Sequence, residues 1–272
     1  MLERFSVDGR SIVVTGGGRG LGRGMALALA AGGARVMLAA RTEDQLLGVV
    51  DEIRAAGGTA THFIYDATSE DDANALVAAC VAEYGRIDVM FANAGGGSGN
   101  VPAEFWEYPT EAYRGVLSTN LDSAFYACRA ASKQMIEQGS GGVVVPTASG
   151  TALRGNRQFA YPTAKGGVIS LAKSMATMLG PHGIRANCIV PGYVSQRPPK
   201  DDRERAEREQ RGHFIPVDRL GEWWELGPLA VFLASDASSY ITGQTFIIDG
   251  GGLAGGLGPA GFRPVYDPAG RA

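Results

Sequence analysis

A tyrosine and a lysine stand four residues apart in the segment "YPTAK", Tyr161 to Lys165, and Ser149 lies twelve residues before the tyrosine. Residues at positions i and i+4 lie on one face of a helix, so the phenol and the ammonium can share a site. A nearby ammonium favours the phenolate and lowers the tyrosine pKa from its ordinary value of about 10. The spacing therefore indicates a proton-transfer site. A surface helix with an ordinary tyrosine is the alternative.

A second chemical signature lies near the start of the chain. The segment "TGGGRGLG", residues 15–22, follows the short apolar run "SIVVT" and opens a helical pattern. Gly16, Gly20 and Gly22 allow a tight turn and let backbone N–H groups approach a diphosphate at the positive end of a helix. Its position between a strand and a helix predicts a dinucleotide site, although a glycine-rich turn alone can be only a turn.

The choice of dinucleotide depends on the residue at the end of the second expected strand, "RVMLAA". A carboxylate there would hydrogen-bond the ribose 2′-OH of NAD(H) and repel a 2′-phosphate. The strand is followed by Arg41 instead, and Arg19 lies within the glycine turn. Two guanidinium groups near one phosphate make strong charge-assisted contacts, so the sequence favours NADP(H). NAD(H) is the alternative if both arginines are only solvated surface groups.

Strand and helix patterns alternate along the chain, and they must bring these residues together. Short apolar runs predict strands within residues 11–15, 35–40, 60–66, 87–95, 142–149, 184–192 and 244–251. Helical patterns cover residues 20–33, 41–58, 69–85, 110–138 and 162–180, and Thr42 and Gln45 have the spacing of a capping box. Parallel strands need crossover connections. The alternation therefore predicts one α/β domain of the Rossmann type, doubly wound, with about seven parallel strands and helices on both faces.

Composition limits the classes of protein that the chain can be. Of its 272 residues 45% are apolar and 19% are charged, which suits one large core. The formal net charge of −3 gives no indication of binding to nucleic acid or a membrane. No signal peptide and no membrane-spanning run is recognisable, so a cytoplasmic protein is expected. The three histidines and three cysteines have no metal-ligand spacing, and free thiols are expected.

Taken together, the motifs resemble the short-chain dehydrogenase/reductase family, and in particular its members that are like 3-oxoacyl-carrier-protein reductases. The resemblance covers about residues 5–251, which would form the dehydrogenase/reductase domain 1–251. The motifs stand in the family's order: "TGGGRGLG" at 15–22, "DAT" at 66–68, "NAG" at 93–95, Asn120, Ser149, "YPTAK" at 161–165, "PG" at 191–192 and "ITGQTFIIDGG" at 241–251. Their joint occurrence is far more specific than any one of them.

The resemblance implies a catalytic tetrad of Asn120, Ser149, Tyr161 and Lys165. Lys165 would also bind the nicotinamide ribose, and Asn120 would hold a water that links Lys165 to solvent. The resemblance further implies a set of cofactor-binding residues. This set is Gly16, Gly18, Arg19, Gly20, Leu21, Arg41, Asp66, Ala67, Asn93, Ala94, Gly95, Tyr161, Lys165, Pro191, Gly192, Val194 and Gln196.

Three of these assignments carry a specific expectation. Asp66 would accept a hydrogen bond from the adenine amino group, and Asn93 to Gly95 would pack beside the adenosine ribose. Pro191 and Gly192 would shape the wall near the nicotinamide. No metal site is implied.

The chain departs from the family pattern at two of these positions. The step from Ser149 to Tyr161 is one residue shorter than usual, and a count without a gap would put Ala148 at the serine position. Ser149 is kept on the assumption of a one-residue deletion before Tyr161. Gln196 stands where a threonine usually contacts the cofactor carboxamide, and either Gln196 or the preceding Ser195 could donate a similar hydrogen bond.

Two segments stand apart from the strand–helix pattern. Residues 195–214 fall where the family carries its substrate lid. Their balanced charges, with Glu204/Arg208 and Glu207/Arg211 as i,i+4 pairs, are also typical of a solvated helix face. Residues 252–272 form a glycine- and proline-rich extension, in which Phe262 and Tyr266 are candidates to contact a neighbouring subunit.

The expected function is an NAD(P)-dependent oxidoreductase that transfers a hydride between nicotinamide and a small-molecule ketone or secondary alcohol. NADPH-dependent carbonyl reduction is the first interpretation, and an NAD-dependent alcohol, polyol or steroid dehydrogenase is the alternative. A catalytically silent NADP-sensing protein on the same fold is a further alternative. The resemblance also implies a homotetramer, or a homodimer.

Overall fold

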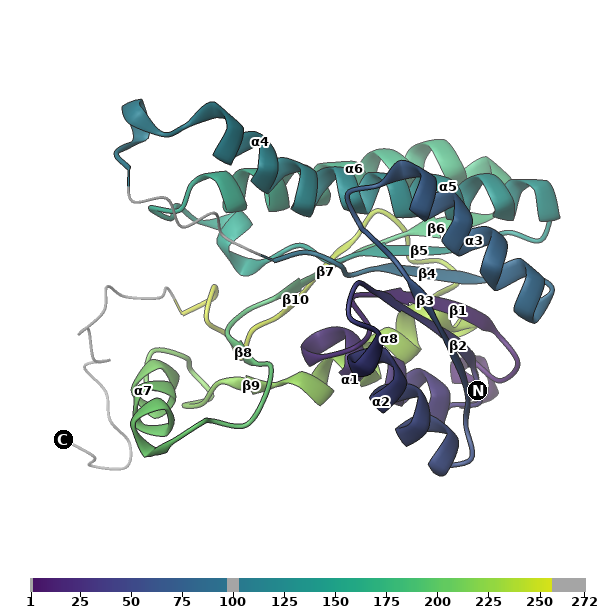
Figure 1. Cartoon of the computed structure of the whole chain (residues 1–272), viewed down its shortest axis with the longest axis horizontal. Helices are drawn as coiled ribbons and strands as arrows, with labels where there is room; N and C mark the ends of the chain where they lie inside the picture. The colour runs from purple at the N-terminus through teal and green to yellow at the C-terminus, as the bar shows by residue number, and fades with distance from the viewer. Residues whose placement is uncertain (1, 97–102, 256–272) are drawn as a thin grey trace.

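A parallel sheet forms the centre of the molecule in the computed structural model, which describes residues 2–96 and 103–255 (Figure 1). Six strands lie in the order β3-β2-β1-β4-β5-β6. They are β1 (Ser11–Thr15), β2 (Arg35–Ala40), β3 (Thr59–Ile64), β4 (Val89–Ala92), β5 (Gly142–Pro146) and β6 (Ile184–Ala186). This is the strand order of a dinucleotide-binding fold, with its switch point between β1 and β4. The predicted doubly wound Rossmann-type fold is therefore confirmed.

Helices cover both faces of the sheet (Figure 1). One face carries α1 (Gly20–Ala31), α2 (Glu43–Ala55) and α8 (Leu226–Ala234); the other carries α3 (Glu70–Tyr84), α5 (Ser123–Gln138) and α6 (Ala160–Leu179). Each layer closes its own apolar core against the sheet, and β1 is buried along its whole length because it faces both. Continuous apolar strands are what a sheet buried on both faces requires.

Helices α1 and α8 approach each other very closely, although about two hundred residues separate them in the chain. A Cβ atom at Gly227 would lie 2.5 Å from the Cβ of Ala28, and one at Gly24 would lie 2.2 Å from the carbonyl oxygen of Trp223. Glycine is therefore the residue that lets these two backbones meet.

The prediction of about seven strands in one sheet is wrong in one detail, which concerns the sixth expected strand. The predicted strand 184–192 is divided into β6 and β7 (Cys188–Pro191), and β10 (Thr245–Ile248) pairs with β7 in a separate two-stranded sheet. Asn187 separates the two pieces. Its side chain donates to the carbonyl oxygen of Ile241 at 2.8 Å and accepts from the Gln244 N–H at 3.0 Å. The Asn187 side chain thus links the break between β6 and β7 to the residues that lead into β10.

The helix predicted over 110–138 is continuous but irregular. It consists of α4 (Thr110–Leu117), a π-helical turn (Ser118–Asp122) and α5. A π-turn inserts one residue into the hydrogen-bond ladder, and such turns commonly occur at functional sites. This irregularity places Asn120 in the middle of the π-turn, where its side chain is completely buried.

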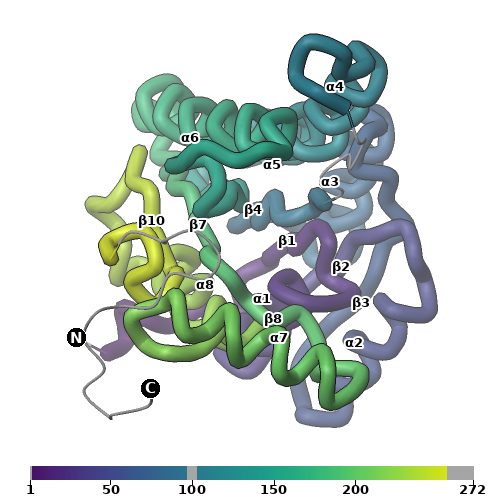
Figure 2. Tube along the Cα trace, turned by 90° about the vertical axis from the view of Figure 1, so that its left-hand side faces the viewer, coloured from purple at the N-terminus to yellow at the C-terminus, as the bar shows by residue number. Residues whose placement is uncertain are grey.

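The 195–214 segment lies beyond the carboxyl ends of the strands, and Figure 2 looks onto this end of the molecule. It contains β8 (Val194–Ser195) and α7 (Asp202–Gly212); β8 pairs with β9 (Gly221–Glu222). The expected pair Glu204–Arg208 forms at 2.8 Å, whereas Glu207 pairs with Arg203 at 3.1 Å instead of with Arg211. In both pairs the acidic and basic side chains stand one helical turn apart, so α7 is a highly charged helix.

Three further places in the chain can be compared with the structure: Thr42, the two tryptophans Trp223 and Trp224, and the C-terminal extension. Thr42 is the N-cap of α2, but its side chain makes no capping hydrogen bond, so the capping-box prediction is wrong. Trp223 packs at a helix start, with the Arg23 guanidinium 4.3 Å from its ring centroid, while Trp224 is exposed. The extension beyond residue 255, including Phe262 and Tyr266, lies outside the described residues.

All three cysteines are buried free thiols, and burial raises the pKa of each to about 12. Within residues 2–96 and 103–255 no helix is both long and apolar enough to cross a bilayer. The same residues contain no cluster of histidine, cysteine and carboxylate side chains fit for a metal ion.

The carboxyl ends of β1 and β4 are joined by one buried hydroxyl. Thr15 Oγ1 accepts hydrogen bonds from the backbone N–H of Asn93 at 3.0 Å and of Ala94 at 2.9 Å. The amide of Asn93 in turn donates to the Thr15 carbonyl oxygen at 3.1 Å. Because this is the switch point of the sheet, these bonds fix the crevice between the two strands.

We expect Thr15→Val to destabilise the protein by about 1–3 kcal/mol, because the buried N–H of Ala94 loses its acceptor without a change in side-chain size. Urea unfolding of the protein without cofactor measures this difference. Thr59→Val, at an exposed position of β3, is the matched control and should change the free energy of unfolding by less than about 0.5 kcal/mol. Equal effects of the two substitutions would contradict the assignment.

Candidate active site

Three elements bring the four residues of the predicted tetrad to one edge of the sheet. Ser149 follows β5, Tyr161 and Lys165 lie in the first two turns of α6, and Asn120 lies in the π-turn. Helix α6 begins at Ala160, so Tyr161 is helical although Pro162 follows it. Proline is tolerated there because the first turn of a helix needs no N–H donor.

The predicted cofactor residues follow the carboxyl ends of neighbouring strands at the same edge. They lie after β1 (Gly16, Gly18, Arg19, Gly20, Leu21), β2 (Arg41), β3 (Asp66, Ala67), β4 (Asn93, Ala94, Gly95), at or after the end of β7 (Pro191, Gly192) and in or after β8 (Val194, Gln196). Ligands of open α/β sheets bind at this edge, outside the strand ends.

Lys165 is a buried amine at the centre of this arrangement. Its side chain is 4% exposed, and Nζ donates to the carbonyl oxygen of Thr147 at 2.8 Å. Burial disfavours the ammonium and lowers the pKa of Lys165 from its ordinary 10.5 to about 8. Nζ lies 5.8 Å from the centroid of the Tyr161 ring. The amine therefore titrates close to physiological pH.

The expected lowering of the Tyr161 pKa is wrong for this structure. Burial raises the pKa of the phenol, and only a hydrogen bond with Ser149 acts in the opposite direction. Lys165 is not among the groups that act on the Tyr161 pKa, and its amine lies 5.8 Å from the ring centroid. Tyr161 is thus a neutral phenol at physiological pH, which suits proton donation.

Ser149, rather than Ala148, faces the phenol. Ser149 Oγ accepts from the Thr151 hydroxyl at 3.0 Å and from the Thr151 N–H at 3.3 Å, so its own hydroxyl hydrogen is the one available for its hydrogen bond with Tyr161. Ala148 is buried in the core between the sheet and α5. The sequence did not single out Thr151 as a partner of the serine, and the hydroxyl two residues after Ser149 was the available signal.

Asn120 fixes the start of the loop after β4. Its Oδ1 accepts from the Gly96 N–H at 3.0 Å, and its Nδ2 donates to the carbonyl oxygens of Gly96 at 3.1 Å and Val116 at 3.0 Å. Both amide hydrogens are therefore used, so only oxygen atoms of this turn remain to hold a water. A Cβ at Gly95 would lie 2.9 Å from Asn120 Oδ1 and 3.2 Å from Lys165 Nζ, so a glycine is needed between them.

The glycine turn forms a cradle that fits a diphosphate. Gly16 and Gly20 have φ angles of +68° and +52°, which disfavour other residues. A Cβ at Gly22 would lie 2.2 Å from the carbonyl oxygen of Gly16. Helix α1 begins here without a side-chain cap, so its first N–H groups and the positive end of its dipole face outward from the turn. These features match the backbone donors and close approach that a dinucleotide needs.

Gln196 lies against this turn. A Cβ at Gly20 would come within 2.9 Å of Gln196 Oε1 and 3.3 Å of Gln196 Cγ. The backbone on either side of Gln196 is held by one guanidinium, because Arg208 donates to Ser195 Oγ at 2.8 Å and to the Arg197 carbonyl oxygen at 2.7 Å. The Ser195 hydroxyl oxygen thus accepts from Arg208 and keeps its own hydrogen, while the Gln196 side chain faces the cradle.

The residues expected to select the dinucleotide lie at the outer end of the crevice. Arg19 and Arg41 are exposed, and neither takes part in an ion pair within the described part of the chain. Asp66 Oδ1 accepts from the Thr68 N–H at 2.9 Å and the Thr68 hydroxyl at 2.8 Å, and these bonds lower its pKa. Asp66 is therefore an anion whose second oxygen can accept from a ligand.

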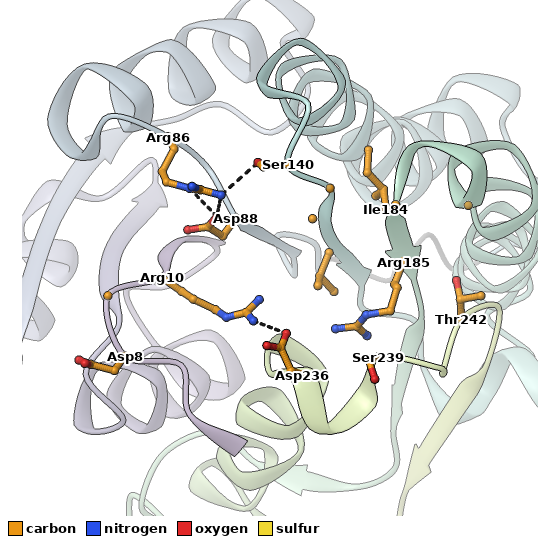
Figure 3. Close-up of a pocket in the computed structure, with 16 residues that line it drawn as sticks. Asp8, Arg10, Arg86, Asp88, Ser140, Ile184, Arg185, Asp236, Ser239 and Thr242 are labelled. Carbon is orange, nitrogen blue, oxygen red and sulfur yellow. Dashed lines mark hydrogen bonds and ion pairs between the residues drawn. The ribbon is translucent and has the colours of Figure 1, made fainter. Parts of the chain in front are cut away.

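Two cavities flank the sheet at opposite ends. One, of about 160 Å³, lies beside Ser149. The larger, of about 690 Å³, lies before the amino ends of β1, β4, β5 and β6 (Figure 3). Its charged groups are engaged with one another: Arg10 pairs with Asp236, Arg86 pairs with Asp88, and Arg185 donates to the carbonyl oxygens of Leu233 and Ser235. None of the predicted site residues lines it, whereas Ser149, Pro191 and Gly192 line the smaller cavity.

Comparison with known proteins agrees with this geometry. The family model described as "Enoyl-(Acyl carrier protein) reductase" matches residues 16–252. The chain is 39% identical to L-rhamnose 1-dehydrogenase (NAD(P)(+)) of Azotobacter vinelandii over 249 residues, which are 89% of this chain and 96% of the relative. It is 36% identical to 2-dehydro-3-deoxy-D-gluconate 5-dehydrogenase of Escherichia coli, with 93% and 99% of the two chains covered.

A solved structure is also similar. The crystal structure of a short-chain type dehydrogenase/reductase from Mycobacterium marinum superposes with a TM-score of 0.84 at 35% sequence identity. The match covers 92% of this chain and 98% of that one.

The buried amine leads to a prediction about stability. The folded amine holds its proton only up to about pH 8 and the unfolded amine up to about pH 10.5, so between these values unfolding takes up a proton and a higher pH favours the folded state. Below pH 8 the buried charge costs on the order of 3 kcal/mol. We therefore expect Lys165→Met to raise the free energy of unfolding at pH 7 by roughly 1–3 kcal/mol, after the loss of the bond to Thr147.

This gain should shrink as the pH rises from 8 to 10.5, because the wild-type amine then becomes neutral in the folded state. Denaturant unfolding of both proteins without cofactor at a series of pH values measures it. Lys173→Met, at an exposed position of the same helix, should show no such dependence. If the difference in unfolding free energy between Lys165→Met and the wild type did not change with pH, the Lys165 amine would not be a buried charge.

Proposed function

Because the chain belongs to the short-chain dehydrogenase/reductase family, we propose that it is an NADPH-dependent carbonyl reductase with Ser149, Tyr161 and Lys165 at its reaction centre. Its relatives are NAD(P)-dependent oxidoreductases that act on alcohol or ketone groups, and the chain is an enzyme of this kind. The single observation that carries the proposal for the site is the hydrogen-bonded pair of Ser149 and a neutral Tyr161 above a buried Lys165 amine.

Each of these groups has one chemical task. The bound nicotinamide supplies a hydride. When substrate binds, Ser149 turns its hydroxyl hydrogen from Tyr161 to the substrate oxygen, and Tyr161 gives that oxygen its proton. Lys165 lies below the phenol and returns a proton to it. Because the pKa of Lys165 is about 8, its amine can both give up and take up a proton at physiological pH. Asn120 holds Gly96 and the π-turn in place beside the amine.

The proposed preference for NADP(H) is supported by charge. Arg19 and Arg41 are both exposed beside the cradle and free of ion pairs among the described residues, and the residue directly after β2 is Arg41 rather than a carboxylate. The direction of reduction is supported by the raised pKa of Tyr161, because a phenol that keeps its proton is the acid that carbonyl reduction needs. Gln196 against Gly20 would cover the diphosphate.

The proposal includes the surroundings of the site. Residues 195–214 act as the substrate lid, since Arg208 fastens α7 to β8 beside the cradle. A homotetramer is supported by exposed apolar side chains on the three elements that the family resemblance puts at subunit contacts. These are Phe125 and Ile136 of α5, Met178 of α6 and Ile247 of β10. A cytoplasmic location is supported by the three free thiols.

We expect the protein to bind NADPH more tightly than NADH, and Arg41→Ala to weaken NADPH binding by about 10- to 100-fold through the loss of a charged hydrogen bond. NADH binding should stay unchanged. Fluorescence titration of the reduced cofactors measures both affinities, with Arg114→Ala on the exposed face of α4 as the control. Equal affinity for the two cofactors in the wild type would overturn the assignment of Arg19 and Arg41.

Tyr161→Phe should lower kcat for carbonyl reduction by about 100- to 10,000-fold and leave NADPH affinity intact, because only the proton donor is lost. In the wild type, alcohol oxidation should become faster as the pH rises above neutrality, since oxidation needs the phenolate and burial raises the phenol pKa. Steady-state rates on a panel of ketones and alcohols test both effects. NADPH binding without turnover of any panel member would favour the silent, cofactor-sensing alternative.

A further inference from the structure

The cavity beside Ser149 contains one cationic side chain without a carboxylate partner in the described part of the chain. Arg154 lines this cavity together with Ser149, Thr151 and Tyr193. Its Nη2 donates to the Tyr193 hydroxyl at 3.2 Å, and its guanidinium lies 5.6 Å from the centroid of the Tyr193 ring. A phenol and a ring face hold the guanidinium in place but do not neutralise it.

The other ionisable group of the cavity wall is already satisfied. Asp249 Oδ1 accepts from the Gly251 N–H at 2.8 Å, and its Oδ2 accepts from the Leu253 N–H at 2.7 Å. Its oxygens are therefore held by the turn that follows β10. The Asp249 carboxylate forms no ion pair with Arg154, so the guanidinium keeps donors for a ligand.

Arg154 also has a fixed place relative to the reacting groups. It directly follows the short 3-10 turn Gly150–Leu153, whose N-cap is Ser149 and whose second residue, Thr151, bonds to the Ser149 hydroxyl. One rigid turn thus carries the serine at its start and the guanidinium at its end. An anion on Arg154 would be held at a set distance from a carbonyl oxygen on Ser149 and Tyr161.

We infer that the substrate is a small oxo acid, with its carboxylate on Arg154 and its reacting carbonyl on Ser149 and Tyr161; this rests on the proposed function. In reduction, the hydride leaves the dihydronicotinamide with its electron pair and bonds to the carbonyl carbon. The Tyr161 proton goes to the oxygen. The products are the hydroxy acid and oxidised nicotinamide, so electrons and atoms balance. The Tyr193 hydroxyl, which accepts from Arg154, keeps its hydrogen for a further oxygen of the substrate.

Size and chemistry point to the same class of molecule. The part of the cavity that the described residues enclose, about 160 Å³, is small beside the range of about 300–1,000 Å³ that is common for larger ligands, and it has room for a small acid. A planar guanidinium matches a carboxylate with two parallel hydrogen bonds, which a neutral sugar ring cannot offer. Arg154 is therefore the residue that would distinguish an oxo acid from a neutral ketone or sugar.

The test compares substrates that differ only in charge. With NADPH and the full chain, 5-oxogluconate and 2-oxogluconate are each measured beside their methyl esters and beside the neutral ketoses fructose and sorbose; rhamnose with NADP⁺ is assayed in the oxidative direction. We expect kcat/KM for the acid to exceed that for its ester by about 10-fold or more, which is what one charged hydrogen-bond pair supplies. This advantage should fall as salt is added.

Arg154→Gln removes the charge and keeps a polar side chain. It should raise KM for the oxo acid by about 10- to 100-fold, change kcat less than about three-fold, and leave the ester and NADPH affinity unaffected. Arg154→Lys should restore part of the loss as a point charge. Arg157→Gln, three residues further on and exposed, is the matched control and should resemble the wild type.

The outcomes separate this inference from the proposed function. Equal kcat/KM for acids and esters, faster turnover of rhamnose or of the ketoses than of any acid, or an Arg154→Gln effect that is the same on neutral and acidic substrates would overturn the oxo-acid inference and leave the reductase intact. NADPH binding without turnover of any substrate would overturn both.

Discussion

The site depends on keeping a single amine out of water. Lys165 Nζ is buried between the end of β5, the loop after β4 and the Tyr161 ring, with a backbone carbonyl as its hydrogen-bond partner. A charged group in such a place is unfavourable. The surrounding structure must therefore hold the amine in place. Three features do so: the absence of a side chain at Gly95, the fully hydrogen-bonded side chain of Asn120, and the Thr147 carbonyl oxygen at the strand end.

This constraint explains why the reaction centre and the cofactor crevice share one framework. The Thr15 hydroxyl joins β1 to the segment after β4, and that same segment continues through Gly95 to Asn120 and the amine. A displacement of the glycine turn would be passed through Asn93 to the surroundings of Lys165. Positive side chains lie at both ends of this path: Arg19 and Arg41 are exposed beside the glycine turn, and Arg154 lines the cavity beside Ser149.

Much of this could be predicted from the sequence, and the exceptions have physical reasons. The alternation of apolar strands and helices indicated the class of fold, since parallel strands buried on both faces are apolar throughout. The break at Asn187 was not visible, because it depends on side-chain bonds to residues more than fifty positions away. The π-turn around Asn120 has no periodicity signal. The Tyr161 pKa was expected to fall because the helical spacing to Lys165 is readable from sequence, whereas the depth of burial that reverses its direction is a tertiary property. Gln196 was expected near the nicotinamide, but the fold of the 195–214 segment brings its side chain against Gly20.

The close meeting of α1 and α8 has a consequence for how the chain folds during synthesis. One of the two cores is closed by α1, α2 and α8, and the glycine contacts between α1 and α8 join residues from opposite ends of the chain. While the ribosome is still making the second half of the chain, the apolar surface of α1 and β1 is not yet covered by α8. Long-range contacts of this kind slow folding and leave hydrophobic surface exposed to neighbouring chains. The nascent protein thus exposes part of this core until residues 226–234 have emerged, and during that interval its apolar surface can contact other chains.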